Sequence, residues 1–411
     1  MIRLLYRYAL WTYQLFIRVA ALFNPKAKQW VDGRRNLFQH MQEHVENTSH
    51  VWFHFASLGE FEQGRPVLER YKEQWPDDPI IVTFFSPSGY THRKDYAGAR
   101  HVFYLPIDSP GNAQTLLDIF QPKAVFFTKY DYWYYYFREC FRREIPLYMV
   151  SCVFQKRQIF FKWYGGFFRK ILGFVSHFFV QNQASIEALS GLGIHQASFS
   201  GDTRFDRVVQ LRSQRRELPL VESWLGATEP VLVAGSTWPE DTEKLRSLRM
   251  HFPEFRIIIA PHEITPNRIR ETQAQFPQSV LYSQLEHEGR VEASEKVLII
   301  DNIGMLSALY AYANIAYVGG GFGEGIHNTL EAATYGVPVI FGPNYQKFEE
   351  AKDLIDRSAG FSIKDAHGLI EIVQSLMDTP ERLEAGRRAA SYVELQAGAS
   401  QKIIDFLIQK T

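Results

Sequence analysis

Residues 314–348 read NIAYVGGGFGEGIHNTLEAATYGVPVIFGPNYQKF, and this stretch indicates the fold class of the chain. An apolar run, Ile315 to Val318, predicts a strand, and five glycines follow it between positions 319 and 325. The polar triplet His327-Asn328-Thr329 predicts a helix start, and Val337 to Phe341 predicts a second strand. Glycines let a backbone approach a ligand closely, and a helix N-terminus favours an anionic group. The stretch therefore predicts a nucleotide or sugar-nucleotide site.

Short strands alternate with helical segments along most of the remaining chain, a pattern typical of parallel, doubly wound sheets. The charged, less regular segment 202–224 is the best candidate for an interdomain linker. We therefore expect an α/β protein of two Rossmann-like domains, 36–201 and 225–411, facing a cleft, with helices at the C-terminal end. The predicted strands outside the opening stretch are Val51–Ala56, Pro79–Phe85, His101–Leu105, Lys123–Thr128, Pro146–Ser151, Ser176–Gln181, Val231–Ala234, Arg256–Ala260 and Val297–Ile300.

Bulk composition is that of an ordinary folded protein. The 411 residues are 46% hydrophobic and 22% charged, and 45 basic residues balance 45 acidic ones. A formal net charge of zero excludes a global polyanion-binding surface, so any basic surface is local. The two cysteines, Cys140 and Cys152, indicate a reducing compartment rather than a disulfide framework.

The first 35 residues differ from the rest of the chain. Leu4 to Phe23 is apolar and aromatic but is interrupted by Arg7, Gln14 and Arg18, and residues 1–35 carry seven basic residues and one acid. This pattern predicts a membrane anchor, either a short span or a helix lying in the interface, with the following domain on the cytoplasmic side. A signal peptide is a weaker interpretation, and an amphipathic helix packed on its own domain is the alternative.

The first candidate for chemistry is HFASLGE, residues 54–60. It predicts a strand, a loop and a helix start, which holds the Glu60 carboxylate at the edge of a cleft, where it could serve as a general base. The structural alternative is that Glu60 only interacts favourably with the helix dipole.

The second candidate is a set of loops at predicted strand ends in the C-terminal half. Hydroxyls, backbone N–H groups and a helix start suit a phosphate, while a carboxylate such as Glu331 suits ribose hydroxyls. Each loop has an ordinary structural alternative, such as a helix cap at Ser236-Thr237. A GxxxxGK[ST] loop is absent and GxGxxG fits poorly, which disfavours P-loop phosphotransfer and dinucleotide dehydrogenases. The loops are Ser236-Thr237, Pro261-His262-Glu263, Gly304-Met305-Leu306 and Asn328–Glu331.

Aromatic residues form the third candidate. Residues 130–137, YDYWYYYF, are richer in tyrosine than a routine core, and residues 154–170 carry seven aromatics, five basic residues and no acids. Such interleaving suits a membrane interface with anionic headgroups. Single-stranded nucleic acid is the less favoured partner, and core packing is the alternative for about half of these side chains. The sequence shows no DxD motif and no CxxC pair, so we expect no metal site.

The order of these motifs resembles the 3-deoxy-D-manno-octulosonic acid (Kdo) transferases of lipopolysaccharide synthesis. The resemblance covers nearly the whole chain, and its most specific parts are HFASLGE and VGGGFGEGIHNTLEAATYGVPVIFGP. It implies an inverting, metal-independent glycosyltransferase of the GT-B fold. The implied donor is CMP-Kdo, the implied acceptor is a lipid A precursor, and the implied location is the cytoplasmic face of the inner membrane, with no nucleic acid partner. Further shared segments are FFSPSGY, YLPID, SGDTRFDRV, AGSTWPED, APHE and DNIGML.

The resemblance also implies roles for individual residues. Glu60 matches the family's general base, and Asp131 and Arg204 match positions that would stabilise the transition state. Some positions depart from the commoner pattern: Arg204 stands for a lysine, Met305 for an acid, and Tyr134 for a proline. Likewise His262 stands for an arginine and Thr329 for a proline. The implied CMP-binding residues are Ser236, Pro261, His262, Gly304, Met305, Leu306, Asn328, Thr329, Leu330 and Glu331.

Two other functions compete with Kdo transfer. One is a different GT-B activity, such as a UDP-sugar transferase or a sugar-nucleotide epimerase. The other is a non-catalytic, membrane-bound sugar-nucleotide-binding protein. The presence of both Glu60 and the glycine-rich stretch argues against the non-catalytic alternative.

Overall fold

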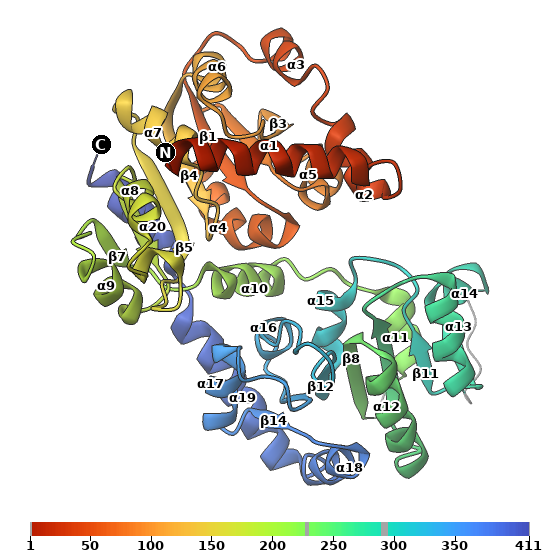
Figure 1. Cartoon of the computed structure of the whole chain (residues 1–411). Coiled ribbons are helices and arrows are strands. Elements are labelled where there is room, and N and C mark those ends of the chain that lie inside the picture. Colours follow the sequence, from red (N-terminus) through yellow and green to blue (C-terminus); the bar gives the residue numbers. More distant parts are fainter. Residues whose placement is uncertain (1, 227–229, 289–294, 411) are drawn as a thin grey trace. The chain divides into compact units, whose positions relative to one another are not determined.

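The computed structural model describes residues 2–226, 230–288 and 295–410. The chain divides into two compact units (Figure 1). Unit 1 comprises residues 1–207 and 398–411, and unit 2 comprises residues 208–397. Within these described residues, each unit holds one seven-stranded sheet in which neighbouring strands are parallel, as the alternation of strands and helices predicts.

Unit 1 has the strand order β3-β2-β1-β4-β5-β6-β7. The order reverses between β1 and β4, and ligands of doubly wound sheets bind outside the carboxyl ends of the strands at such a reversal. Most predicted strands lie within two residues of their observed bounds. The observed strands are β1 (His50–Phe55), β2 (Ile80–Phe84), β3 (His101–Tyr104), β4 (Pro122–Thr128), β5 (Leu147–Cys152), β6 (His177–Val180) and β7 (Ala197–Phe199).

Several helices of unit 1 begin at a Ser or Asn side chain that accepts a backbone N–H of the first turn, as at Ser57, Ser86, Ser109 and Asn182. Such caps fix the strand-to-helix junctions where functional side chains gather. The helices of unit 1 are α1 (Ile2–Ala20), α2 (Pro25–Asp32), α3 (Leu37–His44), α4 (Leu58–Gln74), α5 (Pro87–Arg93), α6 (Pro110–Phe120), α7 (Tyr134–Arg142), η1 (Ile159–Phe161), α8 (Gly166–Leu172), α9 (Gln183–Ser190) and α20 (Ala399–Ile408).

The core of unit 1 lies on both faces of its sheet. Successive side chains of β1 point to opposite faces, so that Trp52 packs into one hydrophobic cluster and Phe53 into the other. The sequence-based interpretation of residues 130–137 as unlike a core was wrong for Tyr134–Phe137, since all four are buried. All four pack into the hydrophobic cluster that also contains Trp52. In residues 154–170 the outcome is mixed: three phenylalanines are buried, whereas Trp163 is 91% exposed.

Unit 2 has the order β10-β11-β9-β8-β12-β13-β14, which reverses between β8 and β12. Its strands are β8 (Val231–Thr237), β9 (Arg256–Pro261), β10 (Ser279–Leu281), β11 (Val297–Ile299), β12 (Ile315–Val318), β13 (Val339–Phe341) and β14 (Gly360–Ser362). Its helices are α11 (Pro219–Leu225), α12 (Pro239–His251), α13 (Pro266–Gln275), α14 (Tyr282–Glu288), α15 (Leu306–Leu309), η2 (Tyr310–Tyr312), α16 (Leu330–Ala333), α17 (Glu349–Asp356), α18 (Ala366–Ser375) and α19 (Thr379–Gln396).

The boundary between the units falls inside helix α10 (Thr203–Ser213), within the segment that we expected to be an irregular linker. The last helix, α20, belongs to unit 1 rather than to the C-terminal domain in which the sequence analysis placed it. Three hydrogen bonds hold the start of α20 against unit 1. Asp206 accepts hydrogen bonds from the N–H groups of Gly398 and Ala399, and Arg70 of α4 donates to Ser400.

Helix α1 packs on unit 1 through a few tyrosines and has no fully buried residue. The Tyr6 hydroxyl donates to Asp108 at 2.7 Å, and the Tyr13 ring contacts the rings of Trp30 and Phe85. Its remaining surface exposes large apolar side chains, including Leu4 and Phe16. Within the described residues, no helix is both long enough and apolar enough to cross a membrane.

Candidate active site

Glu60 lies in the first turn of α4, directly after β1 at the reversal point of the unit 1 sheet. Its Oε2 accepts the N–H of Ala56 at 2.6 Å, and its own N–H donates to Ser57 at 3.4 Å. Burial, followed by the nearby charge of Asp131, raises the pKa of Glu60 to about 7. A carboxylate that exchanges its proton near neutral pH is suited to general acid–base catalysis.

Asp131 follows β4, the strand beside β1. Its Oδ2 lies 3.0 Å from Nε2 of His54 and accepts the indole N–H of Trp133 at 3.3 Å. The carboxylate is thus held in place from two sides. Because Asp131 contributes to the raised pKa of Glu60, the two predicted acidic residues lie close enough to interact.

His54 is fully buried, and it continues a chain of hydrogen bonds into the sheet. Its Nδ1 lies 2.8 Å from the hydroxyl oxygen of Thr83, which also accepts the indole N–H of Trp52 at 2.8 Å. We assign the tautomer with the proton on Nε2, since the Thr83 hydroxyl can then donate to Nδ1 while Nε2 donates to Asp131. The relay therefore orients Asp131 from the core of unit 1.

Arg204 lies on α10, in the part of that helix that belongs to unit 1. Its guanidinium Nε donates to Asp202 at 2.8 Å, and Asp202 also accepts the side-chain amide of Gln63. Charges of Arg204 and of Glu60 both influence the pKa of Tyr130, which burial raises overall. Tyr130, the chain neighbour of Asp131, therefore lies within electrostatic range of both Glu60 and Arg204.

In unit 2, Asp241 organises the glycine-rich stretch after β12. One carboxylate oxygen accepts the N–H groups of Trp238 and Gly320, and the other accepts the Tyr317 hydroxyl. A Cβ on Gly319 would lie 2.4 Å from the Ser236 carbonyl oxygen and 2.7 Å from the Asp241 carboxylate. The first glycine therefore permits a close approach between the loops that follow β8 and β12.

A cavity of about 500 Å³ lies at these strand ends. Trp238, His262 and His327 form one wall as a stack, with ring centroids 4.9 Å and 4.3 Å apart. The Trp238 indole N–H donates to Nε2 of His327, and burial followed by His262 lowers the pKa of His327 to about 4. Flat rings and glycine backbone suit a nucleotide. The other lining residues are Glu240, Asp241, Gly320, Phe322, Gly323, Glu324, Gly325 and Phe348.

Of the residues predicted to bind CMP, only His262 lines this cavity. Ser236 forms a bulge in β8 with a φ of 53°, and the N–H of His262, next to Pro261, donates to the Thr237 carbonyl. Ser236, Pro261 and His262 are thereby brought to the ends of two neighbouring strands.

The other predicted CMP-binding residues lie on two segments that meet beside Tyr310. The short helix α15 leads from Gly304-Met305-Leu306 into Tyr310, whose pKa is raised by burial and by the charge of Glu331. The Asn328 amide donates to Glu331 at 3.0 Å, and its oxygen accepts the N–H of Leu330. The hydroxyl of Thr329 is buried without a hydrogen-bond partner in the described structure, which leaves it available to a ligand or water.

The sequence analysis assigned no site role to several residues that shape these sites, namely His54 and Thr83 in unit 1 and Trp238, Asp241 and His327 in unit 2. His54, Trp238 and Asp241 lie inside the motifs HFASLGE and AGSTWPED, so the motifs held the signal. No sequence signal marked Thr83, because threonine is a common residue in β-strands.

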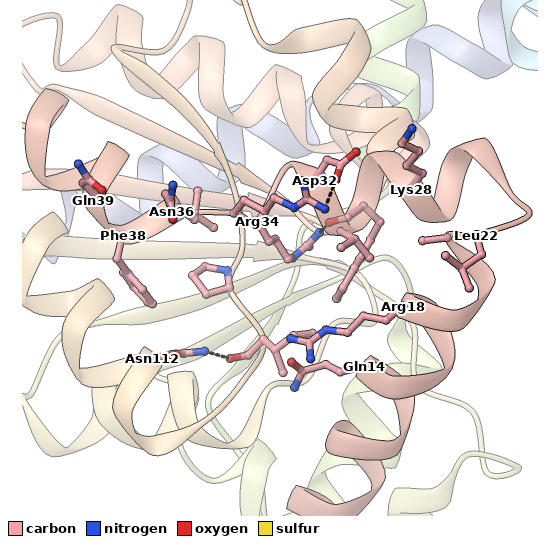
Figure 2. Close-up of a pocket in the computed structure, with 17 residues that line it drawn as sticks. Gln14, Arg18, Leu22, Lys28, Asp32, Arg34, Asn36, Phe38, Gln39 and Asn112 are labelled. Carbon is pink, nitrogen blue, oxygen red and sulfur yellow. Dashed lines mark hydrogen bonds and ion pairs between the residues drawn. The ribbon is translucent and has the colours of Figure 1, made fainter.

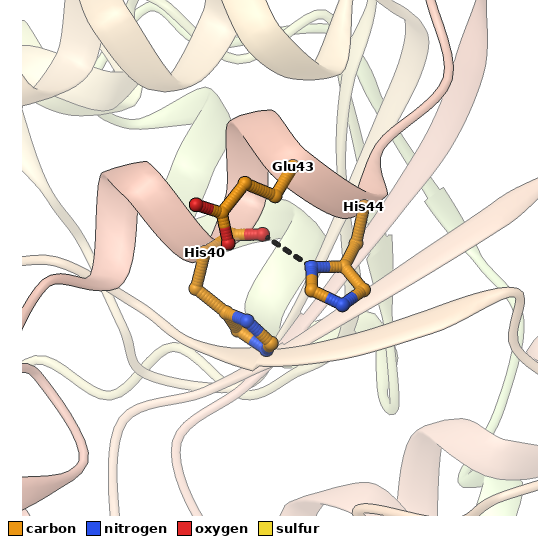
Figure 3. A group of neighbouring side chains, drawn as sticks. All are labelled: His40, Glu43 and His44. Carbon is orange, nitrogen blue, oxygen red and sulfur yellow. Dashed lines mark hydrogen bonds between the residues drawn. The ribbon is translucent and has the colours of Figure 1, made fainter.

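A further cluster of metal-binding side-chain types lies on α3. His40, Glu43 and His44 occupy one helix face with ligand atoms within 4.8 Å of one another (Figure 3). All three are exposed, and Nδ1 of His44 already contacts the His40 carbonyl at 2.9 Å. The sequence analysis did not single out this spacing.

Comparison with known proteins shows which family the chain resembles. A model described as 3-deoxy-D-manno-octulosonic-acid transferase (kdotransferase) matches residues 31–207. The chain is 27% identical over 377 residues to the 3-deoxy-D-manno-octulosonic acid transferase of Bordetella pertussis, covering 87% of this chain and 86% of that protein. It is 23% identical to the Aquifex aeolicus protein of the same name, covering 87% and 93%. The chain is therefore similar to Kdo transferases, over residues 31–207 by the family model and over most of its length by these relatives.

These similarities indicate that the protein is a glycosyltransferase. Solved structures agree on the fold. UDP-GlcNAc 2-epimerase from Neisseria meningitidis matches with a TM-score of 0.63 at 15% identity, covering 88% of this chain and 100% of that chain. MurG from Acinetobacter baumannii matches with a TM-score of 0.56 at 15% identity, covering 89% and 100%. The predicted GT-B fold is thus confirmed.

Proposed function

We propose that this protein transfers Kdo from CMP-Kdo to a hydroxyl of a lipid A precursor, with inversion, as a step of lipopolysaccharide synthesis. The observation that carries the proposal is the Glu60 carboxylate, which stands at the reversal point of the unit 1 sheet with a pKa raised to about 7. The names of the relatives supply the sugar and the reaction class.

In the proposed reaction, Glu60 accepts the proton of the acceptor hydroxyl as its oxygen forms a bond to the anomeric carbon of Kdo. The bond from that carbon to the phosphate oxygen breaks on the opposite face, and CMP leaves with the electron pair. Arg204 offsets charge on the leaving phosphate, and Asp131 stabilises positive charge that develops on the sugar. Both roles are assigned from the resemblance of these positions to the family pattern.

The donor half of the proposed site is the set of strand ends in unit 2. The Trp238–His262–His327 stack and the glycine loop would hold the nucleotide, and Glu331 would accept ribose hydroxyls. We propose that the reaction needs no metal ion, with leaving-group charge offset by the protein's own cations and N–H groups.

The exposed apolar face of α1 supports a further part of the proposal, namely attachment to the cytoplasmic face of the inner membrane. Apolar and aromatic side chains with interleaved arginines suit a helix lying in an anionic lipid interface. An enzyme attached in this way would bind its lipid acceptor at the membrane surface.

The test is transfer in vitro, with CMP-Kdo and a lipid A precursor, read by mass spectrometry of the lipid product. Glu60→Gln should abolish transfer, while Glu73→Gln, on an exposed position of the same helix, should leave it intact. Preference for UDP over CMP in calorimetric titrations would instead favour the UDP-sugar alternative. Near-normal transfer by Glu60→Gln would exclude Glu60 as the base.

A further inference from the structure

A second cavity, about 970 Å³ in volume, lies in unit 1 beside helix α1. Its walls come from the second half of α1, from α2, from the start of α3 and from the segment after β3 (Figure 2). A cavity of this size accommodates the head of a sizeable ligand. Neither the family resemblance nor the proposed reaction assigns it a role.

Positive charge dominates the lining of this cavity. Four of its residues are basic, Arg18, Lys28, Arg34 and Arg35, and one is acidic, Asp32. Asp32 is paired with Arg35 at 3.1 Å, so the other three cations are not neutralised by it. Figure 2 shows Arg18, Lys28 and Arg34 around the same space. A chain with zero net charge therefore concentrates basic charge here, which favours an anionic ligand.

Arg34 is the most informative of these cations. Its guanidinium donates to the carbonyl oxygens of Trp30, Phe85 and Leu105 at 2.7 to 3.1 Å and stacks 3.9 Å from the Trp30 ring centroid. Among the described residues no carboxylate pairs with it. Burial lowers its pKa to about 9, which still leaves it charged at neutral pH. A partly buried cation without a counter-ion favours binding of an anion.

The cavity lies at the same sheet edge as the catalytic residues. Phe85 and Leu105, which accept from Arg34, directly follow β2 and β3, just as Glu60 and Asp131 follow β1 and β4. The Phe85 ring contacts the Trp133 ring at a centroid distance of 5.1 Å, and Trp133 donates to Asp131. Packed side chains of unit 1 therefore connect the cavity with the proposed catalytic centre.

Apolar surface adjoins the charged cavity on one side. Leu22 lines the cavity and is 76% exposed, and its neighbour Phe23 is 85% exposed. The α1 face that leads away from them carries further exposed apolar side chains such as Leu15 and Phe16. A ligand that matches both surfaces has an anionic head and a hydrocarbon tail.

We propose that this cavity binds a phosphate group of the lipid acceptor, with the acyl chains lying along α1. The inference rests on the proposed function in naming the acceptor, but the cavity's preference for a phosphorylated amphiphile is testable without transfer. Arg18 is the residue to change, because its side chain is exposed and its loss should not disturb the fold.

Binding is tested first, by calorimetry with full-length protein and three probes: dodecyl phosphate below its critical micelle concentration, inorganic phosphate, and the uncharged dodecyl maltoside. Dodecyl phosphate should bind most tightly, and Arg18→Gln should weaken it about tenfold, as expected for loss of a charge-assisted hydrogen bond. Arg7→Gln removes an equal charge from α1 outside the cavity and should have little effect. Equal losses in both variants, equal binding of the maltoside, or equally tight inorganic phosphate would overturn the proposal.

Kinetics then connect the cavity with the reaction. Arg18→Gln should raise KM for a phosphorylated lipid A precursor about tenfold, with KM for CMP-Kdo unchanged and no effect on a dephosphorylated acceptor. An equal effect on both acceptors would contradict the phosphate assignment. If the wild-type protein bound dodecyl phosphate through Arg18 but transferred no Kdo, the proposed function would fail while the binding site would stand.

Discussion

The Nε2 atom of His54 lies 3.0 Å from Oδ2 of Asp131, so a fully buried imidazole in the central strand β1 fixes a carboxylate that follows β4. The same carboxylate contributes to the raised pKa of Glu60. His54 therefore fixes the position of Asp131, and the charge of Asp131 in turn helps to raise the pKa of Glu60, the proposed general base. This arrangement makes the acid–base behaviour of the site testable by single substitutions.

The pH dependence of transfer should report Glu60. Burial first and Asp131 second raise its pKa to about 7, so kcat/KM should rise with pH through that value as the carboxylate becomes ionised. Asp131→Asn removes one of the two causes and should move the midpoint to lower pH, in addition to any loss of rate. Rates measured from pH 5 to 9 check this. An unchanged midpoint in Asp131→Asn would contradict the coupling.

The role of His54 is to position Asp131, which predicts a loss in kcat rather than in binding. His54→Leu removes the donor to Asp131 and should lower kcat about tenfold, the typical value of a hydrogen bond to a charged group. KM for CMP-Kdo should not change. His54→Gln offers an amide donor and should recover part of the rate. If His54 only stabilised the fold, kcat would fall equally in His54→Leu and His54→Gln, and both variants would show reduced thermal stability.

Glu60 should also make stability depend on pH. Its folded pKa, about 7, lies above the ordinary value of 4.5, so the folded state binds this proton more tightly than the unfolded state. The resulting stabilisation is complete below pH 4.5 and is lost as the pH rises through 7. A glutamine does not ionise, so Glu60→Gln does not lose this stabilisation at high pH. The Tm of the variant minus the Tm of the wild type should therefore be larger at pH 8 than at pH 5. If this Tm difference did not change with pH, or if Glu73→Gln showed the same change, Glu60 would not be the source of the pH dependence.

The return of α20 to unit 1 predicts where core substitutions act. Ile403 is fully buried in the same cluster as Phe53 and Val82, so Ile403→Ala should destabilise unit 1 by about 2 to 5 kcal/mol. Leu395→Ala, at an exposed end of α19 in unit 2, is the matched control and should change little. Limited proteolysis should show earlier cleavage within 1–207 in Ile403→Ala. Earlier cleavage confined to 208–397 would refute the assignment of α20.

The sequence predicted the sheets well because buried parallel strands are continuous apolar runs, as in Val51 to Phe55 and Ile315 to Val318. The sequence-based assignment of α20 to the C-terminal domain was wrong. An amphipathic pattern indicates that a helix packs on a hydrophobic core, but it does not indicate which of two cores. The sequence likewise did not predict the His54–Thr83 contact, which depends on the register between β1 and β2. The Tyr134–Phe137 run was misjudged because tyrosine is amphipathic, and composition does not separate a buried ring from an interfacial one.

Two glycines in the loop after β12 allow a paired test of the proposed donor site in unit 2. Gly319→Ala would place a methyl group 2.4 Å from the Ser236 carbonyl oxygen and 2.7 Å from Asp241, contacts that neither the backbone nor a fixed carboxylate can relieve. A Cβ at Gly323 has no neighbour closer than 3.7 Å, and Gly323 is not among the positive-φ residues. Gly319→Ala should therefore force the loops after β8 and β12 apart and disturb the Trp238–His262–His327 stack.

The expected result is weaker CMP binding by at least tenfold in Gly319→Ala and near-normal binding in Gly323→Ala, measured by calorimetry. Tm should fall in the first variant and not in the second, because overpacking a fixed backbone contact costs about 1 to 3 kcal/mol. If Gly319→Ala lost stability but kept CMP affinity, the loop would be structural and the nucleotide would bind elsewhere in unit 2. Comparable losses of affinity in both variants would instead indicate that loop flexibility, rather than the contact with Asp241, governs binding.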